Sequence, residues 1–76
     1  MEKGLLNRIT INPEVMVGKP VIKGTRIPVD MIVRLIAQGT KVEEILKDYP
    51  RLSRGDIKAA LMYSAEVVGG ESVLPA

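Results

Sequence analysis

The stretch from position 18 to 32 contains glycine, lysine and threonine, the residue types that bind phosphate in nucleotide-binding loops. Its sequence is GKPVIKGTRIPVDMI. Such a loop needs the order G-x-x-x-x-G-K-[ST], because backbone N–H groups and one lysine must surround the phosphates. Here the first Gly-Lys pair is followed by Pro20, which has no N–H, and Gly24 is followed directly by Thr25 with no lysine between them. The dinucleotide-binding pattern G-x-G-x-x-G is also absent. We therefore expect the glycines to serve turns, with three cations in solvent or against a partner: Lys19, Lys23 and Arg26.

Few residues of this chain suit catalysis. It has no histidine and no cysteine, which removes the commonest general base, the thiol nucleophile and the usual zinc ligands. Ser53, Ser64 and Ser72 have no neighbouring base in the sequence. The acidic residues show no spacing typical of metal ligands, and the adjacent Glu43 and Glu44 would point to different sides of a helix. We predict a protein that is not an enzyme and that holds no metal and no cofactor.

Cationic side chains remain as candidates for a binding function, and the partner that they suit is nucleic acid. Eleven basic and nine acidic residues give a net charge of +2, which alone is too small to indicate nucleic-acid binding. The distribution is uneven, because no basic residue follows Lys58. Six side chains between positions 40 and 58 are candidate DNA contacts, the first three of them to phosphates: Lys41, Lys47, Arg51, Ser53, Arg54 and Lys58. The competing interpretation is that these charges only keep a small protein in solution.

An amphipathic segment precedes these residues and must help to position them. Its apolar side chains recur at positions 29, 32, 33 and 36, which is the spacing of one helix face. Pro28 suits the first turn of such a helix, and Gly39 suits its C-terminal end. Asp30 and Arg34 stand four positions apart, so they can form an ion pair on the opposite face.

Two further helices each follow a recognisable N-terminal cap. Thr40, with Glu43 three positions later, has the spacing of a capping box, and Pro50 ends the short helix that follows. Ser53 with Asp56 is a weaker, acidic version of the same box. The third helix should therefore begin just after Ser53, with basic residues in its first turns.

The third helix is expected to bury Ile57 and Leu61 and to stop at Gly69-Gly70. A bracing helix, a short connection and a capped helix with basic first turns together form a helix-turn-helix unit, whose last helix enters a DNA groove. The sequence thus predicts a mainly α fold with three helices. A three-helix arrangement is also a generic way to build a small core, so this pattern alone leaves DNA binding open.

The first third of the chain has β-strand patterns. Ile9 and Ile11 alternate with polar residues, and two β-prone pieces, 21–22 and 25–27, flank Lys23-Gly24. We expect a small hairpin or β-arch with its turn at that dipeptide. The chain is predicted to form a single domain of residues 1–76 in three parts: a β-arm (8–27), three helices (28–68) and a tail (69–76).

The amount of apolar sequence predicts a partner. In 76 residues, 46% are hydrophobic and no disulfide is possible, so a monomer would be marginally stable and a homodimer is expected. No segment has the length of a membrane span or a signal peptide, which favours a cytoplasmic protein without membrane contact. Nine apolar residues are candidate partner or dimer contacts: Ile9, Ile11, Val21, Ile22, Ile27, Met31, Leu35, Val73 and Leu74.

The stretch RITINPEV…GKPVIKGTRIPVDMIVRLIAQGTKVEEILKDYPRLSRGDIKAAL resembles the small prokaryotic family called domain of unknown function 433, over residues 7–65. GKPVIKGTRIPV is the most specific motif. The resemblance implies a homeodomain-like helix-turn-helix preceded by short strands. It also implies an antitoxin of a type II toxin–antitoxin pair that dimerises, binds operator DNA and neutralises a PIN-like ribonuclease toxin. Positions 16–17, Met-Val, depart from the family, which often has cysteine or a small residue there.

Two classes of function stay open at this point. One is the DNA-binding antitoxin, and the other is a dimeric protein-interaction module that binds no DNA. The tail has no basic residue that could enter the carboxylates of a ribonuclease. If the tail inhibits a toxin, it must do so by packing Val73 and Leu74 into an apolar groove.

Overall fold

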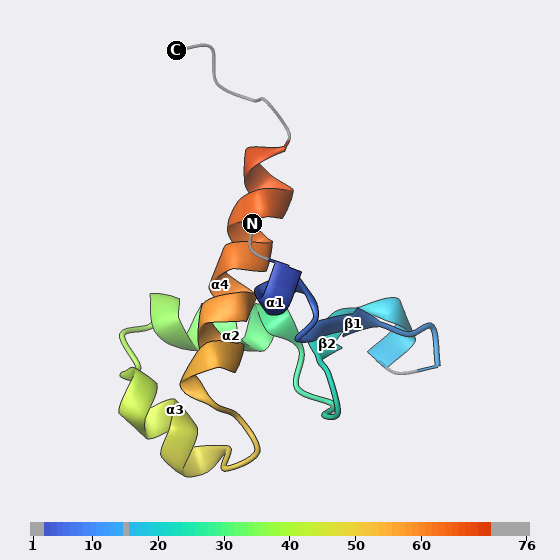
Figure 1. Cartoon of the computed structure of the whole chain (residues 1–76). Helices are drawn as coiled ribbons and strands as arrows, with labels where there is room; N and C mark the ends of the chain where they lie inside the picture. The colour runs from blue at the N-terminus through green and yellow to red at the C-terminus, as the bar shows by residue number, and fades with distance from the viewer. Residues whose placement is uncertain (1–2, 15, 71–76) are drawn as a thin grey trace, which may run out of the picture.

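The computed structural model describes residues 3–14 and 16–70. Within them the chain is mainly helical, with one short pair of antiparallel strands ahead of three longer helices (Figure 1), which confirms the predicted fold class. The sequence patterns did not indicate the first helical turn or the 3₁₀ turn. In chain order the elements are α1 (Lys3–Leu6), β1 (Ile9–Ile11), the 3₁₀ turn η1 (Met16–Gly18), β2 (Pro20–Ile22), α2 (Val29–Ala37), α3 (Val42–Asp48) and α4 (Arg54–Gly69).

The strand pair joins β1 to β2, and the expected hairpin around Lys23-Gly24 is reduced to a turn with one backbone bond across it, from the Ile22 N–H to the Ile27 carbonyl over 3.0 Å. In the sheet Ile9 lies opposite Ile22, Thr10 opposite Val21 and Ile11 opposite Pro20. In the turn the N–H of Thr25 donates to the Ile22 carbonyl over 3.0 Å. Gly24 has a φ of 81°, a left-handed conformation that favours glycine.

The Thr25 side chain explains why residues 25–27 do not continue as a strand. Its hydroxyl donates to the Ile22 carbonyl over 2.7 Å and accepts the N–H of Ile27 over 3.0 Å. These local bonds satisfy the backbone groups that a ladder would otherwise use. A single bridge, between Val21 and Pro28, is the remaining strand-like contact of this segment within the described residues.

The helix ends follow the predicted signals in part. Gly39 ends α2 with a φ of 90°. Ser53 and Asp56 form both halves of the predicted capping box. The box expected from Thr40 and Glu43 is absent, because α3 starts at Val42 with Lys41 as its N-cap and has no side-chain capping bond. This register places Glu43 in the second position of α3, one residue too early for a box.

The core lies where β2 and the three longer helices meet. Its largest fully buried side chains are Ile22, Ile32, Ile45 and Val21. Ala59 and Ala60 are fully buried on α4, and these small residues let neighbouring elements approach that helix closely. Leu61, which was expected to be buried beside Ile57, is 38% exposed. Leu61 is more exposed than predicted because Ala59 and Ala60 occupy the inward side of α4 at that level.

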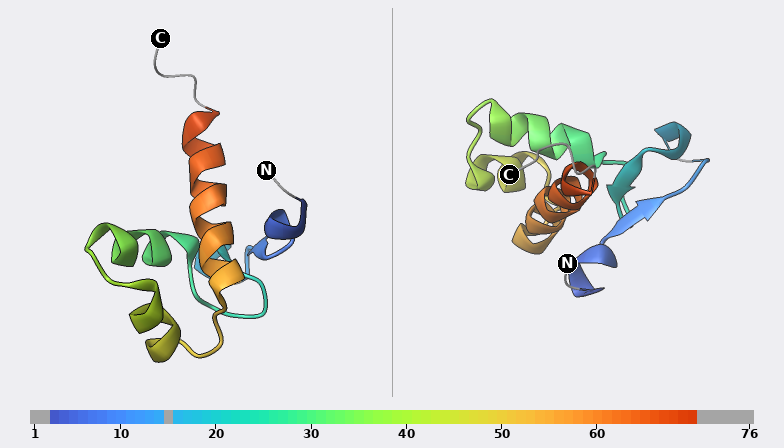
Figure 2. Two further views of the ribbon diagram at one scale, coloured as in Figure 1. Left: turned by 60° about the vertical axis from the view of Figure 1, so that its left-hand side comes forward. Right: turned by 90° about the horizontal axis from the view of Figure 1, so that it is seen from above.

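The C-terminal half of α4 extends beyond the rest of the domain (Figures 1 and 2). All residues from 65 to 70 are exposed. Val67 is 51% exposed and Val68 is 70% exposed. The helix therefore has two different surroundings, a packed N-terminal half and a C-terminal half with little cover.

Candidate nucleic-acid interface

The first turns of α4 present basic side chains to solvent. Arg54 and Lys58 are both exposed and stand four positions apart, so they lie on one face of the helix. Arg51, in the connection from α3, is also exposed. Arg54 has one weak ion pair, 3.8 Å from its Nη2 to Oε2 of Glu43, and both side chains are about two-thirds exposed. Such an exposed pair contributes little to the stability of the fold, so the Arg54 guanidinium stays available to a partner.

The acidic residue of these turns faces inward. The Asp56 side chain is 14% exposed, and its Oδ2 accepts the N–H of Ser53 over 3.0 Å while its Oδ1 accepts Nη1 of Arg8 over 3.0 Å. The backbone N–H of Asp56 in turn donates to the Ser53 hydroxyl over 3.2 Å. The carboxylate is thus both cap and ion-pair partner, so it does not oppose the basic face.

Arg8 was not among the candidate site residues, yet it lies directly over the start of α4. Its Nη1 is also 3.3 Å from the Ser53 hydroxyl. A Cβ placed on Gly55 would lie 2.8 Å from Cζ of Arg8, so the guanidinium rests on a glycine that leaves room for it. The Arg8 side chain is still 45% exposed, and its charge balances that of the Asp56 carboxylate. No local spacing could indicate this contact, since Arg8 and Asp56 are 48 positions apart.

A second long-range bond brings the turn 23–26 to the same end of α4. Arg51 Nη2 donates to the Gly24 carbonyl over 2.9 Å. Lys23 and Arg26, in that turn, are exposed. A shallow hollow lies where the turn meets the α3–α4 connection, lined by Thr10, Asn12, Val21, Gly24, Thr25, Arg26 and Arg51. The basic end of the molecule is therefore built from three segments: the start of α4, the connection before it and the turn.

The two candidate residues on α3 are less well placed. Lys41 is the N-cap of α3 and Lys47 lies in its last turn, and both are exposed. Six positions correspond to about one and two-thirds helical turns, so the two side chains do not share a face. The first turn of α3 also carries Glu43 and Glu44. The structure thus brings together Arg51, Ser53, Arg54 and Lys58, and leaves Lys41 and Lys47 apart from one another.

The sequence comparisons agree with this architecture. A family model described as "Protein of unknown function (DUF433)" matches residues 9–64. The chain belongs to the DUF433 family. The crystal structure of a DUF433 member protein from Anabaena variabilis is similar to it, with a TM-score of 0.76 and 38% sequence identity, covering 91% of this chain and 67% of that one. The resemblance inferred from the GKPVIKGTRIPV motif is therefore confirmed.

Two curated relatives carry no functional description. The uncharacterized protein y4eO of Sinorhizobium fredii is 36% identical over 56 residues, which are 74% of this chain and 25% of that protein. An uncharacterized protein of Archaeoglobus fulgidus is 63% identical over 30 residues, 40% of this chain and 83% of its own length. The chain thus spans about a quarter of the length of y4eO.

The predicted dimer contacts of this DUF433 chain occupy different environments. Val21 and Ile22 are each 1% exposed within the core, so, contrary to expectation, they have no surface to give to a partner. The reason is that α2 and α4 already cover the inner side of the strand pair. Ile11 is 56% exposed. Four others are partly buried: Ile9, Ile27, Met31 and Leu35. Val73 and Leu74 lie outside the described residues.

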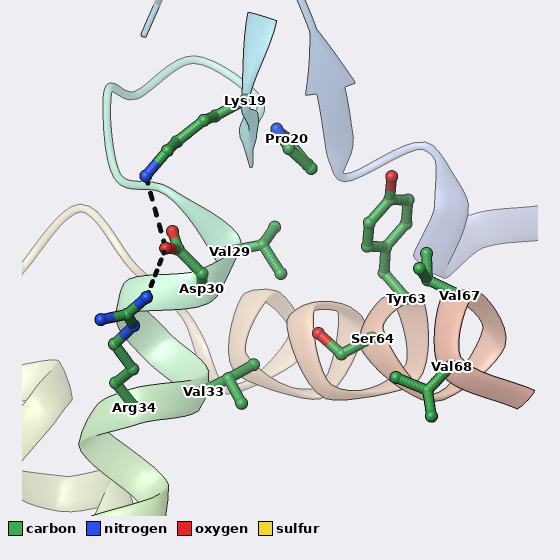
Figure 3. A pocket seen from close by; sticks show the side chains of 10 residues that line it. All are labelled: Lys19, Pro20, Val29, Asp30, Val33, Arg34, Tyr63, Ser64, Val67 and Val68. Atoms are coloured by element: carbon green, nitrogen blue, oxygen red, sulfur yellow. Dashed lines mark hydrogen bonds and ion pairs between the residues drawn. The ribbon is translucent and has the colours of Figure 1, made fainter.

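An apolar groove lies on the side of the DUF433 domain where α2 faces the C-terminal half of α4 (Figure 3). It has a volume of about 450 Å³. Its lining residues are Lys19, Pro20, Val29, Asp30, Val33, Arg34, Tyr63, Ser64, Val67 and Val68. At its rim Asp30 lies 3.4 Å from Lys19 and 3.6 Å from Arg34, which confirms the predicted Asp30–Arg34 pair.

The residues that the structure describes lack two kinds of feature. No cluster of three or more acidic residues there has a geometry suited to a metal ion. No helix there is long and apolar enough to cross a bilayer.

Proposed function

We propose that this DUF433 domain is a cytoplasmic antitoxin that binds operator DNA through the first turns of α4. The supporting observation is the orientation of charge at the start of that helix. Arg54 and Lys58 point to solvent, while Asp56 is turned inward and neutralised by Arg8. The first two turns of this helix therefore present cations to solvent, while their acidic side chain is mostly buried. Such a surface suits the negatively charged backbone and the base edges of a DNA groove.

Each residue of the interface has a distinct part in the proposal. Arg54 and Lys58 would enter the groove, where Arg is the commonest specific partner of guanine. Arg51, with Lys41 and Lys47 on α3, would contact phosphates. The Ser53 oxygen accepts bonds from Asp56 and Arg8, but its own hydroxyl hydrogen remains able to donate to a phosphate oxygen.

Binding of labelled DNA from upstream of the chain's own gene tests the proposal. The double substitution Arg54→Ala with Lys58→Ala should weaken binding by about thirtyfold or more and reduce the preference for the operator over unrelated DNA, whereas Arg51→Ala should lower the slope of log affinity against log salt by about one unit. Arg34→Ala is the matched control, because Arg34 is an exposed arginine on α2 that pairs with an acid as Arg54 does; since Arg34 also borders the apolar groove, DNA binding is compared at protein concentrations where both variants have the same oligomeric state. Unchanged affinity in the double variant, or equal losses for Arg54→Ala and Arg34→Ala, would exclude α4 as the reading helix.

The toxin partner is part of the same proposal and is a PIN-like ribonuclease. Its support is the family resemblance carried by the GKPVIKGTRIPV motif. Co-expression with the product of the neighbouring gene should yield a complex in which ribonuclease activity is inhibited. Truncation after Val68 should weaken that inhibition and spare DNA binding, because Val73 and Leu74 are the apolar residues of the tail. Full inhibition by the truncated chain would remove the tail from the mechanism.

The alternative is a dimeric protein-interaction module that uses no DNA. The observation in its favour is the exposure of apolar side chains on α4, above all Val67 and Val68, because contiguous exposed apolar surface marks a protein contact. Tight binding of a protein partner together with no DNA affinity at physiological salt would favour this function over the first.

A further inference from the structure

We infer that the groove between α2 and α4 receives the C-terminal half of α4 from a second copy of this chain. The two helices would cross antiparallel between Ser64 and Val68. Such a contact is isologous, since each copy supplies both the groove and the helix that fills it. The spacing argument below rests on the proposed DNA binding, whereas the contact itself does not.

The first reason is that the two valines that form part of one wall of the groove, Val67 and Val68, are themselves poorly covered in the single chain. Figure 3 shows Tyr63, Val67 and Val68 of α4 on one side of the groove and Val29 and Val33 of α2 on the other. Val67 and Val68 are more than half exposed in the single chain. In an antiparallel pair, each copy's valines meet the other copy's groove, so both uncovered surfaces are removed from water at once.

The groove floor also suits a close approach of two helices. Ser64 lines the groove with a small side chain, and its hydroxyl already donates to the Ala60 carbonyl over 2.9 Å. Burial of that hydroxyl would therefore leave no donor without a partner. Small residues at a helix crossing reduce the distance between the axes, which improves the packing of the larger side chains beside them.

Charge complementarity favours the antiparallel direction. The last turn of α4 contains no basic residue, so the partial negative charge of its C-terminal carbonyls is not neutralised there. The rim of the groove carries two cations for one acid, because Lys19 and Arg34 both pair with the Asp30 carboxylate. The remaining positive charge of this rim complements the negative end of a helix that enters the groove. A parallel pair would instead place the two negative ends together.

The length of α4 supplies a further argument, which applies if the chain binds DNA. About ten residues separate the crossing from the basic first turns, and at about 1.5 Å per residue the two reading surfaces of an antiparallel pair lie about 30 Å apart. Dimeric helix-turn-helix proteins read half-sites about 34 Å apart, one turn of DNA. A parallel pair would bring the two surfaces to about 10 Å, which is too close for successive major grooves.

Sedimentation equilibrium at micromolar concentration tests the contact with one pair of substitutions. The wild-type chain should be a dimer, and Val67→Lys should raise the dissociation constant about a hundredfold, because it places an unpaired charge in an apolar interface. Met62→Lys is the matched control. It adds the same charge to the same helix at a residue that is 37% exposed and does not line the groove, so it should leave the dimer intact.

A crosslinking experiment keeps the inference testable if Val67→Lys fails to fold. The chain has no cysteine, so mild oxidation of Val67→Cys should give a covalent dimer through that position alone, while Met62→Cys should stay mostly uncrosslinked. A monomeric wild type, a Val67→Lys dimer of normal strength, or equal crosslinking of the two cysteine variants would overturn the inference. So would a chain truncated after Gly70 that dimerises when the full chain does not, since the tail would then be the occupant.

The contact and the proposed function fail in distinguishable ways. A Val67-dependent dimer with no affinity for DNA would keep the inference and reject operator binding. A monomer whose DNA binding depends on Arg54 would do the reverse. If both hold, an operator whose half-sites are moved apart by half a helical turn should bind about tenfold or more weakly, because only one copy then meets its groove.

Discussion

The two halves of α4 differ in what holds them. The N-terminal half carries Ile57, Ala59 and Ala60, all buried, and its first turn is fixed by a capping box and by Arg8. The C-terminal half has no buried residue after Ala60. The exposed surface of the C-terminal half includes the apolar residues Val67 and Val68, whereas that of the N-terminal half includes the basic residues Arg54 and Lys58. One helix thus combines a rigid end whose charges face outward with an end that has too little cover to be stable in isolation.

The largest difference between the halves should appear when a buried and an exposed aliphatic residue are each shortened. Ile57→Ala should reduce the free energy of unfolding by about 3 kcal/mol at any protein concentration, because it leaves a cavity in the core of a single chain. Val68→Ala should cost less than about 0.5 kcal/mol in dilute solution, where that side chain is 70% exposed.

Urea unfolding at two protein concentrations measures both effects. A cost of Val68→Ala that grows with concentration would locate that residue in a contact between copies. A large loss at the lowest concentration would instead mean that the C-terminal half of α4 is packed within one chain, and the contrast between the halves would be wrong.

Removal of the contacts at the start of α4 should have an intermediate effect. Asp56→Ala deletes one half of the capping box and the partner of Arg8, so it should cost about 1–2 kcal/mol. Arg8→Ala should cost less than 1 kcal/mol, since the pair is partly exposed. The double variant Arg8→Ala with Asp56→Ala measures the coupling between the two residues by thermal unfolding. Strict additivity would show that Arg8 and Asp56 do not interact in solution.

The parts of this fold that could be predicted from sequence are those set by neighbours three or four positions apart. The Ser53–Asp56 box and the Asp30–Arg34 pair have such spacing, and the end of α2 depends on one local residue, Gly39. A spacing alone is not sufficient, as the unformed Thr40–Glu43 box demonstrates: the register of α3 is set by burial of Ile45 and its neighbours in the core.

The parts that could not be predicted join distant segments. Arg8 reaches Asp56, and Arg51 reaches Gly24, across separations that no periodicity describes. The pairing of β1 with β2 was missed for a related reason, because the Thr25 hydroxyl satisfies the backbone that the nearer hairpin needed. The candidate DNA contacts of α4 and the capping bonds of Asp56 could be predicted from the sequence, whereas the ion pair of Asp56 with Arg8 depends on tertiary contact.

The smallest expected effects come from the two glycines of α4, one in each half. Nothing lies within 4 Å of a Cβ placed on Gly69, so Gly69→Ala should raise the free energy of unfolding by about 0.5 kcal/mol through the lower helix propensity of glycine. The same change at Gly55 meets the Arg8 guanidinium at 2.8 Å. Arg8 is flexible and can move aside, but it then loses its bonds to Ser53 and Asp56, so the propensity gain should be cancelled.

The gain in helix propensity at Gly55 can be measured apart from the loss of the Arg8 contact when Arg8 is replaced. In an Arg8→Ala background, Gly55→Ala should become stabilising by about 0.5–1 kcal/mol, because the helix propensity gain remains and nothing opposes it. Paired thermal melts of the four Arg8 and Gly55 combinations give this value directly, with Gly69→Ala as the reference for an unobstructed site. If Gly55→Ala stabilises the wild-type chain as much as it does the Arg8→Ala chain, Arg8 does not rest on α4, and the Asp56 carboxylate is held inward by its capping bond to Ser53 without help from Arg8.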